Sequence, residues 1–593
     1  MPENLLAVEV EYLNPMSEIR LQHRVHLVDA KAHLIEVETT VSSSRSAALP
    51  SPLVVFMAVW TPGSYLVREY ARHVEGVAAG AHAVKKTRKN AWQIDHGGAP
   101  EVTVRYRVYA NDLTVRTNHV DDAHLYLNGA PTFFAVEGHE DAPAEITLAV
   151  PESFRVATAL PRVPGKPFTF AAKDFDTLVD SPIEVGDFRE GTVTACGVPH
   201  RYAVWPPESI TDDNFQKLLG ATKAIVETEA ALFGGSLPFP DYTFILHLSP
   251  RGRGGLEHRA STTLLAPQGS FETRDGYLDL LSLVAHEYFH LWNVKRLRPA
   301  GLFPYRYDQE NYTRLLWWFE GGTSYYDWRT LRLAKLCTET EYLDHLAHEI
   351  AYLDGTPGRL VHALEEASFD AWIKLYRPDE NSPNSTISYY RKGELVNALL
   401  DVEIRVRTNG ARSLDHVLAL LWERHGSVEL PVPEDGMQKI FEDAAGVPLE
   451  DLFATGSRGT TEIDAAGTLR KIGLAVERTV KDGAALGVRT RDSGGRVTVQ
   501  AVLRGGAAHG AGVEAGDEIV AIGDRRLDGS TVDGITSKLA PGTTTTVLVA
   551  RDGKLKSLPI TLEAPRERRT KIVPSGYATD AQKALFRAWM GGG

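Results

Sequence analysis

The sequence predicts a multidomain α+β protein, with a β-rich N-terminal domain, a mixed α/β to helical middle domain and a small β-rich C-terminal domain. Three observations support this prediction. The 593 residues exceed what a single hydrophobic core usually accommodates. Apolar residues recur at every second position in the first third of the chain and at helical spacing after it. Beyond about residue 465 the composition shifts towards Gly, Val and Ala.

The N-terminal domain, residues 1–205, is expected to consist mostly of strands. Its clearest run places apolar side chains on one face of a strand and polar side chains on the other. The apolar positions are Val102, Val104, Tyr106 and Val108, and the polar positions are Thr103, Arg105 and Arg107. Frequent Pro and Gly residues divide the domain into short strands.

The middle domain, residues 206–460, begins where the hydrophobic repeat changes. Apolar residues across 215–226 recur at helical spacing, and acidic residues suited to a helix start precede them. A strand is expected at 242–248, and long helical patterns run across 277–450. This domain should therefore begin as mixed α/β structure and continue as helices.

Composition and charge exclude several classes of protein. With 64 Lys and Arg against 77 Asp and Glu, the formal charge is −13, which argues against nucleic-acid binding through general basic attraction. No stretch approaches the roughly 18 uninterrupted apolar residues of a membrane helix. Residues 1–15 lack the basic start of an export signal, so we expect a soluble, cytoplasmic chain. The only cysteines, Cys196 and Cys337, exclude a Cys-rich zinc site and leave His and carboxylates as possible metal ligands.

The stretch 279–300 carries a pattern typical of catalytic metal sites. Its apolar periodicity predicts a helix, on which His286 and His290 lie only about 40° apart on one face. Two imidazoles at this spacing can share one metal ion, and Glu287 is within reach as a general base for hydrolysis. The alternative is a pair of ordinary histidines on an amphipathic helix.

Glu320 is the candidate third ligand. A catalytic site with two His ligands needs one further N or O donor and an open position. Glu320 follows His290 after 29 intervening residues and lies among the aromatic residues of 317–326. Because an unpaired carboxylate is costly to bury there, we expect a cation beside it. The alternative is a surface Glu at a helix turn.

A basic run, Lys295, Arg296 and Arg298, follows the two histidines. Cations at the end of a helix are favoured by the helix dipole. We therefore expect this run to stabilise the end of the predicted helix rather than to bind a substrate carboxylate.

A glycine-rich stretch at 254–258 is expected to lie beside the metal site. It follows the strand at 242–248 and precedes 262–265, which we predict as a strand at the edge of a cleft. There the Glu257 carboxylate could bind the terminal ammonium of a peptide, while free backbone groups around Gly255 align the peptide by strand addition. The alternative is an ordinary salt bridge in a glycine loop.

Tyr390, within 388–393, supplies a phenol farther along the middle domain. Such a group can donate a hydrogen bond to the oxyanion of a tetrahedral intermediate. A tyrosine that simply packs in the core is the alternative.

The C-terminal stretch resembles a PDZ domain across 465–562. The residues that match its carboxylate-binding loop are Ala485, Leu486, Gly487 and Val488. The run 512–519 matches its central turn and strand. The resemblance implies binding of a peptide or protein C-terminus at Leu486, Gly487 and Val488, and a small packing domain without a ligand is the alternative. The tail, 563–593, is expected to be a solvated connector.

The whole chain resembles the glycyl aminopeptidase family of gluzincin zinc metallopeptidases, which carry a C-terminal PDZ domain. The resemblance rests on motifs spread through the N-terminal and middle domains. These are Trp60-Thr61-Pro62-Gly63-Ser64-Tyr65 with Arg72-His73-Val74, Gly255-Leu256-Glu257-His258, His286-Glu287-Tyr288-Phe289-His290 with Trp292-Asn293-Val294-Lys295-Arg296, Glu320-Gly321, and Tyr390-x-Lys392-Gly393. The middle domain is then expected to have a thermolysin-like fold.

The resemblance also implies roles for the candidate residues. His286, His290 and Glu320 would bind one zinc ion. Glu287 would be the general base and then the acid, and Tyr390 would stabilise the transition state. Glu257 would bind the substrate amine, although related enzymes follow this Glu with Asn where this chain has His258.

The implied activity is removal of a small N-terminal residue, Gly or Ala, from a peptide with a free amino terminus. Two alternatives remain open at the level of the sequence. One is an endopeptidase whose PDZ domain holds protein C-termini. The other is a non-catalytic scaffold in which the PDZ domain is the functional part.

Overall fold

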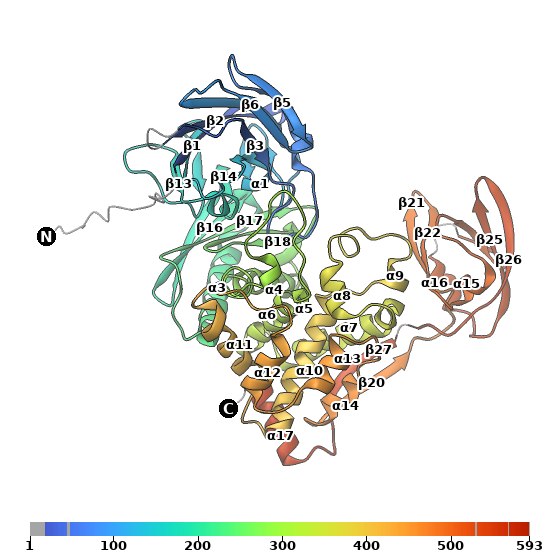
Figure 1. The fold of residues 1–593 in the computed structure, drawn as a ribbon. Coiled ribbons are helices and arrows are strands. Elements are labelled where there is room, and N and C mark those ends of the chain that lie inside the picture. The colour runs from blue at the N-terminus through green and yellow to red at the C-terminus, as the bar shows by residue number, and fades with distance from the viewer. Residues whose placement is uncertain (1–17, 44–47, 528–530, 567, 592–593) are drawn as a thin grey trace. The chain divides into compact units, whose positions relative to one another are not determined.

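The computed structural model describes residues 18–43, 48–527, 531–566 and 568–591, and Figure 1 shows its fold. The chain divides into two compact units. One contains the residues up to Arg296 together with Leu302–Asn311, and the other contains Leu297–Gly301 and the residues from Tyr312 onward. Residues 1–15, on which the expectation about an export signal rests, lie outside the described part.

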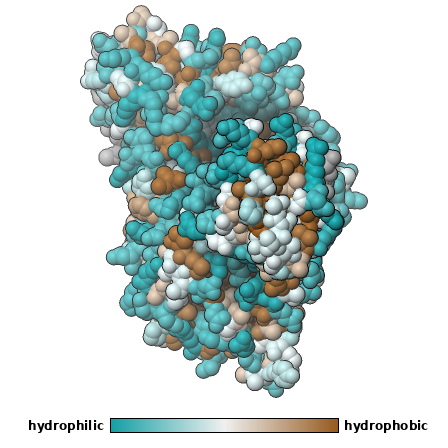
Figure 2. All heavy atoms as spheres, turned by 90° about the vertical axis from the view of Figure 1, so that its right-hand side faces the viewer, coloured by the Kyte–Doolittle hydropathy of each residue, from teal (hydrophilic) through white to brown (hydrophobic). Residues whose placement is uncertain are grey.

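Hydrophilic residues cover most of the face shown in Figure 2, with apolar residues in small groups between them. Within the described ranges, no helix combines the length and the apolar character that crossing a membrane requires.

Three sheets of the first unit form the β-rich part that the sequence predicts. The six-stranded sheet has the order β13 (Thr169–Ala172), β11 (Ala144–Ala149), β1 (Ile19–Asp29), β2 (Leu34–Ser43), β7 (Glu101–Tyr109) and β4 (Val74–Ala78). The second sheet has the order β10 (Phe134–Val136), β3 (Leu53–Met57), β6 (Ala91–Asp95) and β5 (Ala83–Arg88). The third has the order β12 (Arg155–Ala157), β14 (Ile183–Gly186), β9 (His124–Leu127) and β8 (His119–Val120).

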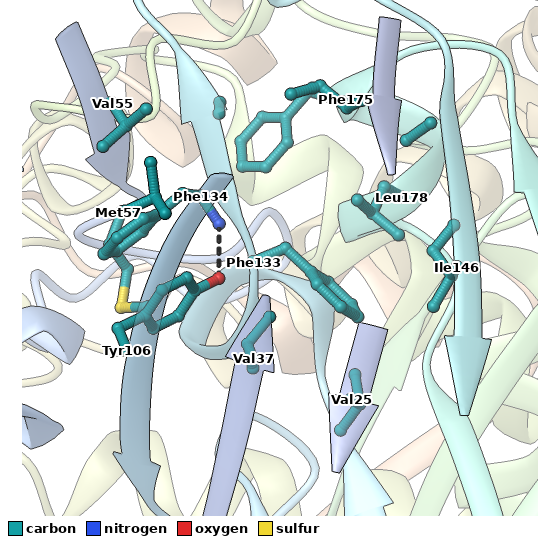
Figure 3. Close-up of a cluster of buried hydrophobic side chains, with 14 of the residues drawn as sticks. Val25, Val37, Val55, Met57, Tyr106, Phe133, Phe134, Ile146, Phe175 and Leu178 are labelled. Atoms are coloured by element: carbon teal, nitrogen blue, oxygen red, sulfur yellow. Dashed lines mark hydrogen bonds between the residues drawn. The ribbon is translucent and has the colours of Figure 1, made fainter. Parts of the chain in front are cut away.

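Strand β7 confirms the predicted alternation, because Val102, Val104, Tyr106 and Val108 are all buried. They belong to one hydrophobic core, and Figure 3 shows the part of it around Tyr106. There the Tyr106 ring stacks on Phe134 with 3.8 Å between centroids. The Phe134 N–H donates to the Tyr106 hydroxyl at 3.1 Å, so this buried phenol is satisfied within the core.

A five-stranded sheet completes the first unit. Its order is β15 (Arg189–Ala195), β16 (Val198–Trp205), β17 (Tyr242–Ser249), β19 (Ser261–Pro267) and β18 (Gly254–Glu257). Strands β16, β17 and β19 are parallel, and β18 runs antiparallel to β19 at the edge. The prediction of a cleft-edge strand at 262–265 is therefore wrong: β19 is internal and buried, and β18 forms the edge.

Helices α3 (Asp212–Leu232) and α4 (Arg274–Phe289) pack against each other in this unit. Thr211 caps α3 by accepting a hydrogen bond from the Asn214 N–H at 3.3 Å, and the expected acidic residues, Asp212 and Asp213, lie in the first turn instead. Two short helices, α1 (Gly129–Thr132) and α2 (Phe175–Val179), lie among the strands of the β-rich part.

The second unit is mainly helical, as predicted. Its helices are α5 (Leu316–Phe319), α6 (Gly321–Leu333), α7 (Glu339–Asp354), α8 (Leu364–Phe369), α9 (Ser382–Ser385), α10 (Arg391–Arg407), α11 (Leu414–Leu421), α12 (Met437–Ala445), α13 (Glu450–Gly456) and α14 (Ala465–Arg470). Helices α6 and α10 approach through glycines, since a Cβ on Gly321 would lie 2.6 Å from the Gly393 Cα. This contact explains the glycines that follow Glu320 and Lys392.

A small sheet near the C-terminus forms its own hydrophobic core. Its order is β21 (Val488–Ser493), β22 (Arg496–Val502), β23 (Glu518–Ile522), β25 (Thr544–Arg551) and β26 (Lys554–Thr561), and β24 (Arg525–Arg526) pairs with β23. Helices α15 (Ala507–Ala511) and α16 (Val532–Thr536) belong to the same part.

The tail is not the solvated connector that we expected. Strand β27 (Arg568–Pro574) pairs with β20 (Leu474–Val480), a strand from the stretch that we had assigned to the PDZ domain. Helix α17 (Asp580–Trp589) then buries Trp589, whose Nε1 donates to the Tyr325 hydroxyl at 3.1 Å. We interpreted the basic residues of the tail as a sign of a solvated segment and therefore did not predict this amphipathic helix. Glu567 and residues 592–593 lie outside the described part.

Candidate active site

The two histidines of the predicted metal pattern meet at the end of α4. His290 follows the last residue of α4 but keeps helical dihedral angles, with φ −62° and ψ −19°. The Nε2 atoms of His286 and His290 lie 3.1 Å apart. The helix does not continue to residue 300 as expected, and Val294 has a φ of +141°, which is incompatible with an α-helix.

The remaining nitrogen of His290 fixes the protonation state of its ring. Its Nδ1 lies 2.8 Å from the Asn293 carbonyl oxygen, which can only accept a hydrogen bond. Nδ1 therefore carries the proton, and Nε2 presents its lone pair towards the Nε2 of His286. A backbone carbonyl in this role is typical of histidines that bind a metal ion. The residues present thus fit a divalent cation, and Asn293 is a contributor that the sequence analysis missed.

Glu287 fills the space left by the missing side chain of Gly255 on β18. A Cβ on Gly255 would lie 2.1 Å from the Glu287 Cδ and Oε1 atoms. Both residues are buried, and the Gly255 carbonyl accepts a hydrogen bond from Arg116 Nη2 at 3.2 Å. Gly255 therefore sets the position of the Glu287 carboxylate against the edge strand.

Glu257, the last residue of β18, is only 3% exposed. Its Oε1 atom has no hydrogen-bond partner among the described residues. Oxygen atoms of Glu257 and Glu287 and a ring nitrogen of His290 all lie within 4.8 Å of one another. A buried carboxylate with an unsatisfied oxygen is expected to bind a cation or another donor.

Gly63 closes over Glu257 from the N-terminal domain. Its φ of +89° is a backbone conformation that suits glycine, and a Cβ there would lie 2.4 Å from the Glu257 Oε2 atom. The motif Trp60-Thr61-Pro62-Gly63-Ser64-Tyr65 therefore contributes directly to the walls of the site. Its glycine after a proline was the only local signal for this contact.

A buried ion pair lies behind Glu257. Lys295 Nζ binds Asp180 Oδ1 at 2.6 Å, and His258 Nδ1 lies 3.3 Å from the same oxygen. Burial disfavours the charged form of Asp180, but Lys295 and His258 together outweigh it and hold the pKa of that carboxyl below its usual value. Burial lowers the pKa of Lys295, but the negative charges of Asp180 and Glu257 outweigh this and raise it overall.

The role that we expected for the basic run is therefore wrong for its first two residues. Lys295 binds Asp180, and Arg296 Nη1 donates to the carbonyl oxygens of Leu291 at 2.8 Å and Arg259 at 3.0 Å. These side chains are bound in the fold rather than exposed at a helix end. Asp180 and Arg259 are distant in the sequence, so no local pattern indicated these contacts.

Glu320 and Tyr390 belong to the second unit. Glu320 lies between α5 and α6 and is 2% exposed. The hydroxyls of Tyr390 and Tyr376 lie 3.0 Å apart. Burial raises the pKa of Tyr390 well above its usual value, and the negative charge of Glu320 adds to the increase. Tyr390 therefore remains a hydrogen-bond donor at neutral pH.

Comparison with known families gives three matches along the chain. The peptidase M61 N-terminal domain matches residues 22–187, the M61 glycyl aminopeptidase domain matches 279–396, and a PDZ domain matches 484–562. The order of the three matches is the order that the motifs predicted. The chain carries both M61 peptidase domains and a PDZ domain. This M61 protein is therefore a metallo-aminopeptidase.

One solved structure shares this fold over most of the chain. The M61 protein resembles an aminopeptidase N family protein from Idiomarina loihiensis with 29% identity and a TM-score of 0.89, over 96% of this chain and 100% of that one. It also matches an M1 zinc metallopeptidase from Deinococcus radiodurans at 16% identity and a TM-score of 0.46, over 77% of this chain and 98% of that one. The second likeness is too low to carry an argument. Among proteins with curated descriptions, none matches the chain.

Proposed function

We propose that this M61 protein removes a small N-terminal residue, Gly or Ala, from peptides, using one zinc ion bound by His286, His290 and Glu320. The observation that carries the proposal is the arrangement of the α4 histidines, the Glu287 carboxylate against Gly255 and the unsatisfied Glu257 oxygen. Glu320 is a proposed ligand because the matched M61 segment, 279–396, contains it together with both histidines.

The protein's own groups account for the proton transfers of peptide hydrolysis. Zinc in such a site supplies a Lewis acid for the scissile carbonyl and lowers the pKa of water. Glu287 accepts a proton from the attacking water and passes it to the leaving amine. Tyr390 donates a hydrogen bond to the developing oxyanion, for which its raised pKa keeps it protonated.

Glu257 sets the position at which the peptide is cut. The ammonium of a free N-terminus satisfies the buried Glu257 oxygen, which has no other partner in the described chain. The edge strand β18 aligns the following residues through its backbone. The preference for Gly or Ala follows from the family, and the approach of Gly63 to Glu257 supports a confined amine site.

Replacing Glu257 by Ala is the test of the aminopeptidase proposal. We expect kcat/KM for free glycyl and alanyl substrates to fall about 10- to 100-fold, because a charge-assisted hydrogen bond to the ammonium is lost. The exposed Glu272→Ala in the same unit serves as the control. Acetylated substrates should be resistant to the wild-type protein. Cleavage of acetylated and free substrates at similar rates would instead establish an endopeptidase.

The PDZ domain is proposed to bind the C-terminus of a peptide or protein. A cavity of about 480 Å³ is lined by Leu486, Gly487 and Val488 on one side and by residues of α16 on another. Strand β21, which begins at Val488, is an edge strand and can accept an added strand. A peptide whose C-terminus is free should bind, and the same peptide with an amidated C-terminus should not.

A further inference from the structure

A cavity in the second unit shares no residue with the proposed active site, and we propose that it binds a small phosphate-bearing polyanion. Its volume is about 740 Å³. Its wall is formed by residues of α7, α10, β20 and β27 and by the segments that connect them. The charged residues that line it are Arg359, Lys392, Arg478, Arg504, Arg566, Arg568, Asp354, Glu462 and Asp464.

Lys392 is the residue whose environment indicates a bound ligand. It is 2% exposed, and its Nζ has no hydrogen-bond partner within the described ranges. Burial lowers the pKa of this ammonium to about 8, and the nearby Arg359 contributes to the decrease. It also lies in the first turn of α10, where the helix dipole disfavours a cation. An isolated buried charge is costly, and a bound anion would compensate it.

The carboxylates around the cavity are already engaged by other groups. Each has a partner at hydrogen-bond distance, and none of these partners is Lys392. The three contacts are Arg359 with Glu462 at 2.5 Å, Arg478 with Asp354 at 2.7 Å, and the Gly467 N–H with Asp464 at 2.8 Å. Asp464 uses its side chain to cap α14. Within the described ranges, Lys392 Nζ makes no hydrogen bond to any of these carboxylates, so a bound anion would supply its nearest negative charge.

The surplus of charge identifies the class of ligand. Among the described lining residues, six cationic side chains face three acidic ones. One of the six, Arg566, pairs with Glu563 at 3.3 Å, which leaves a surplus of two positive charges. Guanidinium groups match the geometry of phosphate oxygens through paired N–H donors. A surplus of this size suits an anion with two or more negative charges better than a single carboxylate.

Calorimetric titration of the full-length holoenzyme with pyrophosphate tests this inference. We expect saturable binding that Lys392→Met weakens about 10- to 100-fold, because hydrogen bonds to a charged group are lost. Arg568→Gln, an exposed change on β27, should weaken it by about tenfold. Lys571→Gln removes the same charge from the same strand at a position that does not line the cavity, and it should leave the Kd unchanged.

Three outcomes would overturn the proposal. One is the absence of saturable binding up to about 10 mM pyrophosphate. Another is equal affinity in the wild type, Lys392→Met and Arg568→Gln, which would locate the anion at the zinc ion. The third is acetate binding as tightly as pyrophosphate. Lys392→Met removes an uncompensated buried charge, so the Tm of this variant in anion-free buffer should not fall. If the Tm does fall, the Kd of Arg568→Gln alone tests whether pyrophosphate binds in this cavity.

Discussion

Replacing Glu287 by Gln is expected to lower kcat by about a thousandfold while the zinc content stays that of the wild type. Gln has nearly the same shape as Glu and fits the space beside Gly255, so α4 and the edge strand should be unchanged. The amide cannot accept the proton of the attacking water. The measurement is kcat for a glycyl substrate together with metal analysis of the same preparation.

The control for Glu287→Gln is Glu272→Gln, the same exchange at an exposed position of the same unit. It should keep the wild-type kcat. If Glu287→Gln retained both its zinc and wild-type turnover, Glu287 would not be the general base, and another group would have to accept the proton.

Replacing Gly255 by Ala is expected to reduce kcat/KM by about a hundredfold with little loss of stability. The added methyl group would overlap the Glu287 side chain, whose carboxylate can rotate away more easily than the backbone of β18 can move. The general base is thereby displaced while the sheet is retained. Activity and Tm, measured on the same protein, separate displacement of Glu287 from unfolding.

Gly254→Ala is a closely matched control for Gly255→Ala. It lies one residue earlier on β18, and its Cβ would meet only the Arg116 guanidinium, at 3.5 Å from Nη1 and 3.9 Å from Nη2, which are ordinary contact distances. This variant should retain most of the wild-type activity. Equal losses in the two variants would show that β18 tolerates no side chain, and the specific role of Gly255 beside Glu287 would be refuted.

Local patterns in the sequence were sufficient to predict part of this site. The spacing of His286 and His290 on one helix determines that their ring nitrogens meet, and it was visible without any tertiary information. The strand β7 and the capped helix α3 were predictable for the same reason. The family resemblance supplied the order of domains, and the proposed boundaries between them remain predictions.

Contacts between distant segments could not be read from the sequence. Gly63 and Glu257 meet although they are far apart in the sequence, and the same is true of Asp180 and Lys295. Such pairs depend on how distant segments pack, and local periodicity in the sequence does not encode that packing. The tail was misread for a similar reason, because Trp589 finds its partner Tyr325 only after the helices of the second unit have packed.

The zinc content of Glu320→Gln, measured after dialysis against a weak chelator, tests the central claim most directly. If His286, His290 and Glu320 bind one ion, the variant should retain much less than one zinc per chain and lose activity. Glu380→Gln, an exposed change in the same unit, should keep one zinc per chain. Full zinc occupancy and normal turnover in Glu320→Gln would contradict the proposed ligand set.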